Sequence, residues 1–197
     1  MQLTKEEILQ EFKDAQAILK GHFILSSGLH SDTYMQCARV LMQAKRAEKL
    51  CKSLALKLKE QLGENFADIV VSPAMGGVIV GYELARQLDL ESIFCERVDG
   101  AFEFRRGFDL AAGKRVLVVE DVITTGKSSL ETFKLIEAKG CKIVAEACLV
   151  DRSNNPELGN LLKVPVVSLF DIDIKTFDKD NIPEELKNIE AIKPGSR

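Results

Sequence analysis

The sequence predicts an α/β fold in which a parallel sheet is flanked by helices and joined to a small N-terminal hood. Short β-branched segments alternate with amphipathic helical segments from residue 68 onward, and Gly-rich turns connect them. The composition, 46% hydrophobic and 29% charged, is that of an ordinary soluble globular domain. Since the chain contains no internal repeat, low-complexity segment or linker, we expect a single domain over residues 1–197, with residues 1–40 forming the hood.

The first element expected is a helix near the N-terminus. Thr4 and Glu7 have the spacing of a capping box. Apolar residues then recur at helical spacing as far as Leu19, and Gly21 is expected to end the helix.

Two further elements complete the N-terminal part. Residues 22–36 predict two short extended segments around a Ser-Gly turn. Residues 44–62 have the apolar periodicity of an amphipathic helix, which Gly63 is expected to end.

The remainder alternates strand and helix, a pattern typical of a parallel sheet covered on both faces. Such sheets bind ligands in the loops that follow the carboxyl ends of their strands. The expected strands are 68–73, 92–96, 115–120, 142–150 and 164–170, the last of them ending the sheet, and the expected helices are 77–88 and 128–139.

Charge and cysteine content narrow the class of protein. A formal net charge of -3 argues against a protein that coats nucleic acid. The five cysteines are odd in number and widely spaced, which predicts buried free thiols in a reducing compartment. The first twelve residues lack the apolar core of a signal peptide, and no apolar stretch is long enough to span a membrane. We therefore expect a cytoplasmic protein with no membrane partner.

The segment "RVLVVEDVITTGKS", residues 115–128, contains the most informative motif. Its Gly-Lys-Ser ending suggests the Walker loop of a nucleotide-triphosphate kinase. That loop requires glycine five residues before Gly126, where this chain has Asp121, a carboxylate that would repel the triphosphate. The sequence therefore excludes the kinase reading.

The same segment fits a sugar-phosphate site better. Glu120 and Asp121 end an apolar strand, where paired carboxylates can accept hydrogen bonds from vicinal sugar hydroxyls and lie near a hydrated magnesium ion. Residues 124–128 then begin a helix whose free N–H groups and positive end suit a phosphate monoester. The competing interpretation is that both acids are solvated residues at the end of a strand.

Residues 116–128 resemble the phosphoribosyl-pyrophosphate signature of type I phosphoribosyltransferases, without a gap. "SPAMGGVIVGYELA", residues 72–85, resembles the pyrophosphate loop of the same family, where backbone N–H groups can form an anion nest. The resemblance implies that both loops bind phosphoribosyl pyrophosphate, through Glu120, Asp121, Val122, Ile123, Thr124, Thr125, Gly126, Lys127, Ser128, Ala74, Met75, Gly76 and Gly77.

Residues 23–36 resemble the hood of orotate phosphoribosyltransferases, one branch of this family. By that resemblance, Tyr34 and Met35 flank the orotate ring, with Ser26 and Thr124 as further orotate contacts. Arg152, in "LVDRS", matches an arginine that holds the orotate carboxylate, for which a planar guanidinium is well suited. Without the resemblance, a surface salt bridge would be the better interpretation of this arginine.

The family's mobile catalytic loop corresponds to residues 96–108, and here the chain departs from the pattern. The usual lysines and histidine are missing, and the alternating phenylalanines indicate a hairpin. Arg97 matches an arginine that the family lends to the neighbouring subunit, and Arg105 and Arg106 are the other cations of the loop. Two further lysines of the family are replaced by Ser26 and Gly76.

The resemblance implies a transfer from phosphoribosyl pyrophosphate to orotate that uses Mg²⁺, in a homodimer with shared active sites. Asp121 and the arginines Arg97, Arg105 and Arg106 would be the catalytic groups, and no protein side chain would bind the metal directly. Two alternatives remain open: a purine phosphoribosyltransferase, and a non-catalytic regulator that senses phosphoribosyl pyrophosphate.

Overall fold

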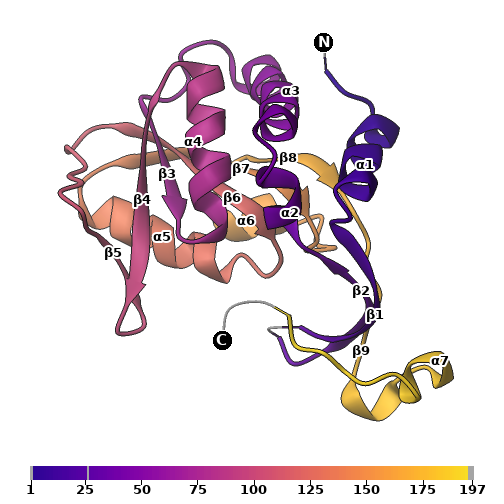
Figure 1. The fold of residues 1–197 in the computed structure, drawn as a ribbon. Helices are drawn as coiled ribbons and strands as arrows, with labels where there is room; N and C mark the ends of the chain where they lie inside the picture. Colours follow the sequence, from indigo (N-terminus) through magenta and orange to yellow (C-terminus); the bar gives the residue numbers. More distant parts are fainter. Residues whose placement is uncertain (1, 26, 195–197) are drawn as a thin grey trace.

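A computed structural model describes residues 2–25 and 27–194 and confirms the expected fold class. Its centre is a six-stranded sheet with the order β5-β4-β3-β6-β7-β8 (Figure 1). All neighbouring strands are parallel except β5, which runs antiparallel to β4 at one edge. The strands are β3 (Ile69–Pro73), β4 (Glu91–Val98), β5 (Ala101–Phe104), β6 (Arg115–Ile123), β7 (Lys142–Asp151) and β8 (Val166–Asp171).

Helices cover both faces of this sheet, so its central strands are buried apolar runs. One face packs on α1 (Lys5–Asp14), α2 (Cys37–Leu41), α3 (Ala44–Leu62) and α4 (Gly76–Leu88), and the other on α5 (Lys127–Ala138) and α6 (Leu158–Leu162). The expected helices at 44–62, 77–88 and 128–139 are confirmed to within one residue at each end. Gly63, with φ of 85°, ends α3 as expected.

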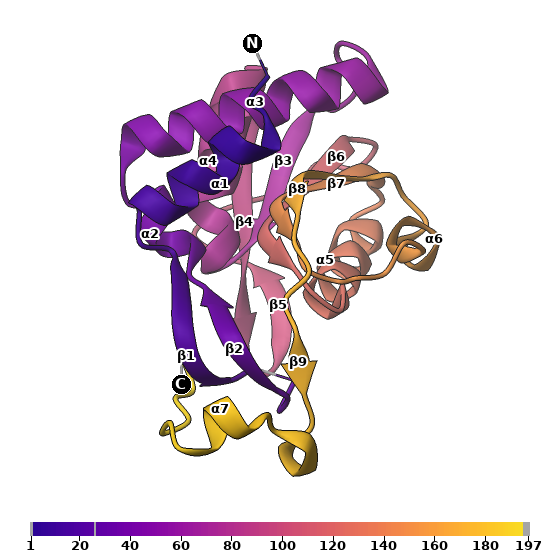
Figure 2. The same ribbon diagram turned by 90° about the vertical axis from the view of Figure 1, so that its right-hand side faces the viewer.

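A second, three-stranded sheet forms the hood below the main sheet, with the order β1-β2-β9 (Figure 2). The first two strands, β1 (Ile18–Ile24) and β2 (His30–Met35), form the hairpin expected in residues 22–36. The third, β9 (Thr176–Phe177), comes from the C-terminal part of the chain, as do the short helices η1 (Lys179–Asn181) and α7 (Glu184–Lys187). The hood therefore combines segments from both ends of the chain.

The C-terminal segment is tied to β1 by backbone and side-chain hydrogen bonds. Ile24 N donates to Ile192 O, and Ile192 N donates to His22 O. The buried rings of His22 and His30 lie with Nε2 and Nδ1 2.6 Å apart, and His22 Nδ1 is 3.0 Å from Ile189 O. Both histidines therefore fix the hood, and His30 presents little surface to a ligand.

Two expectations about the hood are wrong. The first helix ends at Asp14, and Leu19 lies in β1 opposite Tyr34, because Gln16 adopts φ of 51° and turns the chain into the hairpin. The strand at 166–171 is not the last, since β9 follows it and pairs with β2. Only two residues long, β9 is too short to show a period of two in the sequence.

The cysteines agree with the expectation for free thiols. All five are unpaired and buried, and burial raises the pKa of Cys51 to about 12 and that of Cys95 to about 11. Over the described residues, no helix combines the length and the apolar character that a bilayer crossing requires.

Candidate functional site

The acid pair lies within β6, because the strand continues beyond Glu120 and Asp121 to Ile123. Glu120 is 9% exposed and Asp121 is half-buried, and Asp121 Oδ1 accepts a hydrogen bond of 2.9 Å from Val122 N. Neither acid forms an ion pair within residues 2–25 and 27–194. The burial of Glu120 excludes the interpretation that both acids are solvated residues at a strand end.

The environment of both carboxyl groups favours the protonated form. Burial, followed by the charges of Asp121 and Glu146, raises the pKa of Glu120 well above its usual value. Burial also raises the pKa of Asp121, although a backbone hydrogen bond from Val122 opposes the shift. The pair is therefore poised to gain from a ligand that donates hydrogen bonds or brings positive charge.

The phosphate-type loop, residues 124–128, follows directly and leads into α5. Gly126 is left-handed with φ of 73°, a conformation that favours glycine, and a Cβ there would lie 3.2 Å from Leu162 Cδ2. The N-cap residue Gly126 has no side chain to cap α5, which begins at Lys127, one residue earlier than expected, and Lys127 N donates to Thr125 Oγ1 at 3.4 Å. The N–H groups that follow in the first turn therefore remain available to an anion.

The second loop, at the start of α4, packs against the acid pair. A Cβ at Gly76 would lie 2.5 Å from Asp121 Oδ1, and one at Gly77 would lie 2.9 Å from Val119 O. Glycine at 76 thus lets the helix start approach the Asp121 carboxylate closely, and a larger residue would require the Asp121 side chain to move. One part of the expected nest is wrong: Ala74 N donates to Cys95 O at 2.8 Å, so only Met75, Gly76 and Gly77 can offer their N–H groups.

Arg152 and Tyr34 lie close enough for the charge of each to affect the pKa of the other. Arg152 follows β7, is half-buried, and has a buried Nε with no hydrogen-bond partner in the described part of the chain. Burial lowers the pKa of Arg152, while the charge of Tyr34 acts in the opposite direction. Burial raises the pKa of Tyr34. The charge of Arg152 lowers this pKa, and the charge of Asp121 raises it further. The surface salt bridge considered for Arg152 is absent among the described residues.

The three other residues expected to contact the base are Met35, Thr124 and Ser26. Met35 is 3% exposed and belongs to the core, so it supports the hood from within. Thr124 is exposed at the start of the phosphate-type loop. Ser26 lies outside the described residues.

Residues 96–108 form the expected hairpin. A two-residue turn joins β4 to β5, with Asp99 and Gly100 both at positive φ, the Asp-Gly pattern of a tight hairpin. Arg97 forms an ion pair with Glu131 of α5 and lies 4.3 Å from the ring centre of Phe102.

The two remaining cations of the hairpin differ in their surroundings. Arg106 makes two hydrogen bonds to Glu96, of 2.9 and 2.8 Å. Arg105 is exposed and forms no ion pair with any residue that the structure describes. Of the two, Arg105 has the charge available for a ligand.

The candidate site offers a metal ion only part of a ligand set. No group of three or more His, Cys, Asp or Glu side chains among the described residues is placed to hold a metal ion. The two acids of β6 offer oxygen atoms of the kind that Mg²⁺ prefers, but they are too few for a complete protein ligand set. The site therefore fits a magnesium ion that is bound mainly by the substrate and lies near the two acids.

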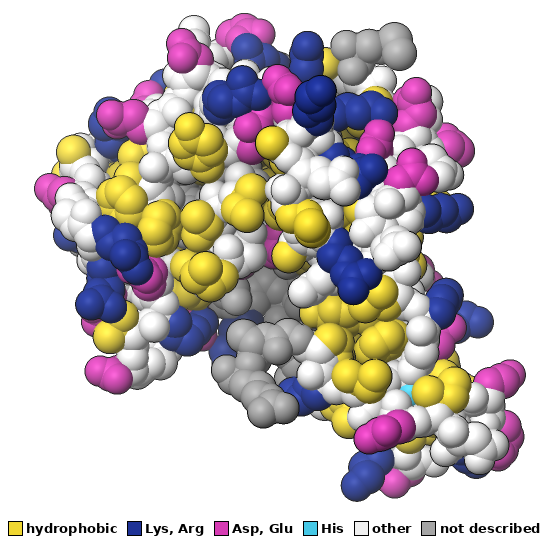
Figure 3. Space-filling view, viewed as in Figure 1, with side chains coloured by type: hydrophobic (Ala, Val, Ile, Leu, Met, Phe, Trp, Pro, Cys, Tyr) yellow, Lys and Arg dark blue, Asp and Glu magenta, His cyan; other side chains and the backbone are white. Residues whose placement is uncertain are grey.

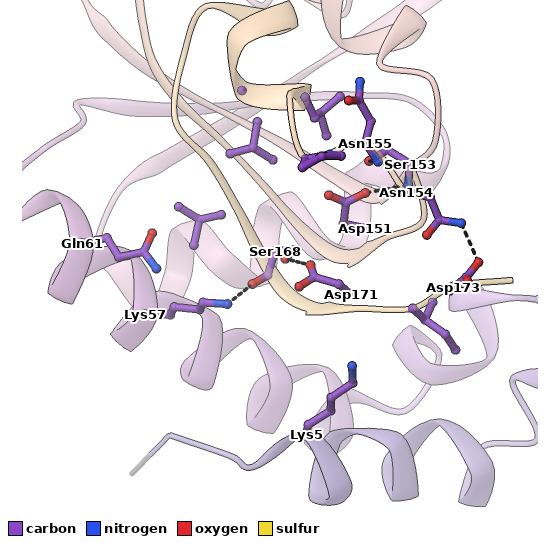
Figure 4. A pocket seen from close by; sticks show the side chains of 16 residues that line it. Lys5, Lys57, Gln61, Asp151, Ser153, Asn154, Asn155, Ser168, Asp171 and Asp173 are labelled. Carbon is purple, nitrogen blue, oxygen red and sulfur yellow. Dashed lines mark hydrogen bonds between the residues drawn. The ribbon is translucent and has the colours of Figure 1, made fainter.

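A separate cavity of about 690 Å³ lies at the β8 edge and contains none of the residues above (Figure 4). Lys57 donates to Ser168 O at 2.7 Å on one wall, and Asn154 donates to Asp173 at 2.6 Å on another. Since its charged groups have both signs and it contains none of the acids or arginines described above, we assign it no part in the chemistry.

One buried acid near the site was missed from the sequence. Glu146 lies in β7, is completely buried, and both of its carboxylate oxygens lack a hydrogen-bond partner within residues 2–25 and 27–194. Its signal was present as the single acid inside the apolar run "KIVAEACLV".

Known proteins share this arrangement. A profile of the phosphoribosyl transferase domain family matches residues 40–188. The chain belongs to the phosphoribosyltransferase family. It is 52% identical to the orotate phosphoribosyltransferase of Sphingopyxis alaskensis, over 99% of this chain and 98% of that protein. The same name belongs to a relative in Maricaulis maris that is 47% identical over 99% of this chain and 98% of that protein.

Solved structures of this phosphoribosyltransferase family have the same fold. The orotate phosphoribosyltransferase from Aeropyrum pernix is 28% identical, with a TM-score of 0.67 over 83% of this chain and 93% of that one. An adenine phosphoribosyltransferase from Saccharomyces cerevisiae has the same TM-score, 0.67, at 19% identity, over 84% of this chain and 99% of that one. Because enzymes for two different bases share the fold, the choice of base depends on the hood and its neighbours.

Proposed function

We propose that this site transfers a phosphoribosyl group from 5-phosphoribosyl 1-pyrophosphate to orotate, giving orotidine 5'-monophosphate and pyrophosphate. Two uncapped helix starts, at Gly76 and Lys127, flank a buried pair of acids. That arrangement suits a ligand with an anionic group at each end and vicinal hydroxyls between them. The proposed reaction belongs to the de novo synthesis of the pyrimidine nucleotide UMP.

The 5-phosphate binds at the start of α5. The N–H groups of residues 125–128 and the side chains of Thr124, Thr125, Lys127 and Ser128 surround it there. Glu120 and Asp121, with the adjoining backbone of Val122 and Ile123, hold the ribose hydroxyls. The pyrophosphate faces the loop of residues 74–77.

The single observation that supports orotate over other bases is the buried, unpartnered Nε of Arg152. A guanidinium that is partly withdrawn from water without an acid beside it costs free energy, and a planar carboxylate that binds it through two hydrogen bonds offsets that loss. Purine bases and uracil carry no carboxylate. Tyr34, whose titration responds to Arg152, provides an aromatic face beside the same position.

Catalysis is attributed to positioning and charge, without a protein nucleophile. As the bond from ribose C1 to pyrophosphate lengthens, positive charge develops on the sugar, as in glycoside cleavage. The carboxylate of Asp121 lies beside the sugar and stabilises that charge. When bound with the substrate, Mg²⁺ neutralises part of the pyrophosphate charge. Arg105 adds a cation to the leaving group.

A homodimer with shared sites is part of the proposal. Figure 3 shows hydrophobic side chains gathered on the face that carries α4, and Met75, Ile79 and Tyr82 in this helix region are 80%, 49% and 66% exposed. A second copy of the chain covering these side chains would remove them from water. In such a dimer, Arg97 would exchange Glu131 for a site in the neighbouring subunit. The five free thiols favour a reducing compartment, which we infer to be the cytoplasm.

The test is a substrate comparison. Purified protein is mixed with phosphoribosyl pyrophosphate and Mg²⁺, and the loss of orotate absorbance is compared with turnover of uracil, adenine and hypoxanthine. Orotate alone should be consumed. Faster turnover of a purine would support the alternative phosphoribosyltransferase, and no turnover of any base would support a regulator.

A further inference from the structure

Glu146 carries a carboxyl group in the protein core, on the face of the sheet that α5 covers. In the parallel pairing of β6 with β7, Val118 lies beside Glu146 and Glu120 lies beside Cys148. Residues two apart in a strand share a face, so Glu146 and Glu120 both point toward α5. A completely buried acid without a hydrogen-bond partner among the described residues is costly to keep.

Among the described residues, the polar groups that act on Glu146 or respond to its charge are acidic or neutral. Glu120 faces it from β6, Ser129 from the first turn of α5, and Asp151 and the Cys148 thiol lie on its own strand. Its partner on β8 is Val166, which does not titrate. No Lys or Arg among the described residues forms an ion pair with it. A negative charge on Glu146 is therefore opposed by burial and by the nearby charges of Asp151 and Glu120.

We propose that Glu146 is a positioning residue for the transfer reaction, whose carboxyl group sets the charge of Glu120 from within the core and so the pH at which the site accepts a phosphoribosyl ligand. The inference rests on the proposed function, because Glu120 is there the acid that binds ribose. When Glu146 is neutral, Glu120 loses its proton more easily and can accept hydrogen bonds from two hydroxyls. When Glu146 is ionised, the two buried charges repel each other, and Glu120 keeps its proton to a higher pH.

The surroundings of Glu146 place this effect near neutral pH. Burial raises the pKa of Glu146 to about 7, with the Ser129 hydroxyl acting in the opposite direction and the charge of Asp151 adding to the rise. The charge of Glu146 in turn contributes to the raised pKa of Glu120. Both carboxyl groups then titrate as a coupled pair.

The test uses the dissociation constant of ribose 5-phosphate, measured by calorimetry from pH 5 to pH 9 without Mg²⁺ or base. Binding by the unmodified protein should tighten as Glu120 ionises. In Glu146→Gln the same tightening should occur roughly one pH unit lower, because the repulsion is gone. Glu146→Leu, which removes the same charge with a different side chain, should shift the curve in the same direction. Cys148→Ala, on the same strand and face, removes no acid and should leave the curve unchanged.

The outcomes separate the inference from the function on which it rests. If the unmodified protein binds ribose 5-phosphate and the curves of both Glu146 variants coincide with it, the positioning role is wrong while the proposed site stands. If it fails to bind at any pH, the inference is wrong, and the comparison of bases decides the proposed function separately. Should neither variant fold, the ¹³C-labelled carboxyl of Glu120, assigned with Glu120→Gln, is titrated in the unmodified protein. Two coupled steps are expected, and a single step would overturn the inference.

Discussion

Two regions carry the charged groups of the proposed site, and they are built in opposite ways. At the end of β6, Glu120 and Asp121 are buried or half-buried and have no opposite charge beside them among the described residues. In the β4–β5 hairpin, Arg97 and Arg106 are exposed and already paired with Glu131 and Glu96. The acids of β6 therefore lack a partner of opposite charge within the described chain, whereas most arginines of the hairpin already have one.

The difference indicates where substrate contributes most binding free energy. A buried acid gains strongly from a ligand that satisfies it, while an exposed ion pair must first be broken and is worth little in water. We therefore expect changes in the β6 region to have larger effects than changes in the hairpin. Two arginines should be exceptions within the hairpin: Arg105, which lacks an ion pair among the described residues, and Arg97, which the proposed dimer carries into the neighbouring site.

The largest effect is expected for Asp121→Asn. The substitution preserves shape but removes the charge next to the developing cation on the sugar, so kcat should fall by about 100- to 1,000-fold. Steady-state kinetics with saturating orotate and Mg²⁺ measures the loss, and circular dichroism checks the fold. Turnover within about twofold of the unmodified protein would show that the acid pair has no catalytic role.

A large recovery is expected when Arg97→Ala and Asp121→Asn homodimers, each nearly inactive, exchange subunits. Half of randomly formed dimers are mixed, and each mixed dimer has one intact site of two, so activity should return to about a quarter of the unmodified level. If Arg97 acts in its own subunit beside Glu131, every site carries a lesion. Continued inactivity after subunit exchange has been shown by mass spectrometry would exclude sharing.

Within the hairpin, Arg105→Ala should cost about tenfold in kcat/KM, or about 1.4 kcal/mol of transition-state stabilisation. Arg106→Ala is the matched control, because its guanidinium already binds Glu96, and it should cost about threefold or less. Both are compared by initial rates at low phosphoribosyl pyrophosphate. Equal losses would show that the ion pair does not withdraw Arg106 from the reaction.

The last effect is on thermal stability rather than on turnover, and it is expected from Glu146→Gln. The pKa of Glu146 is raised from 4.5 to about 7 in the folded chain, so its contribution to stability is fully present below about pH 4.5 and is lost as pH rises through about 7. Relative to the unmodified protein, the variant should gain up to about 3 kcal/mol between pH 4.5 and pH 8, several degrees in Tm. A Tm difference that stays constant with pH would contradict the buried-acid interpretation.

The sequence predicted the β6–α5 region well because its determinants are local. An apolar strand, two acids and a left-handed Gly126 follow one another within a few residues. The contacts that decide the other features join distant segments. Neither the pairing of Arg106 with Glu96 nor the packing of Gly126 on Leu162 has a signature in residue spacing. The third hood strand is two residues long and lies more than a hundred residues from its partner β2.

The surroundings of Glu146 were also beyond what the sequence could predict. A lone acid in an apolar strand signals an unusual site, but the identity of its neighbours depends on the register of β6 and β7. Similarly, "LVDRS" marks Arg152 only through resemblance, and its burial without a partner follows from the way β7 meets the hood. The spacing of residues in the sequence identifies candidate site residues, whereas the packing of the folded chain determines which of their charges lack a partner.

The central claim is that Arg152 is left without an acid in order to bind the carboxylate of the base. The most direct test measures kcat/KM for orotate and for uracil in the unmodified protein and in Arg152→Ala. The account predicts that orotate loses about 30- to 150-fold, or about 2 to 3 kcal/mol, while the low value for uracil changes by less than about threefold. An equal loss for both bases would contradict it, because Arg152 would then support the site without recognising the carboxylate.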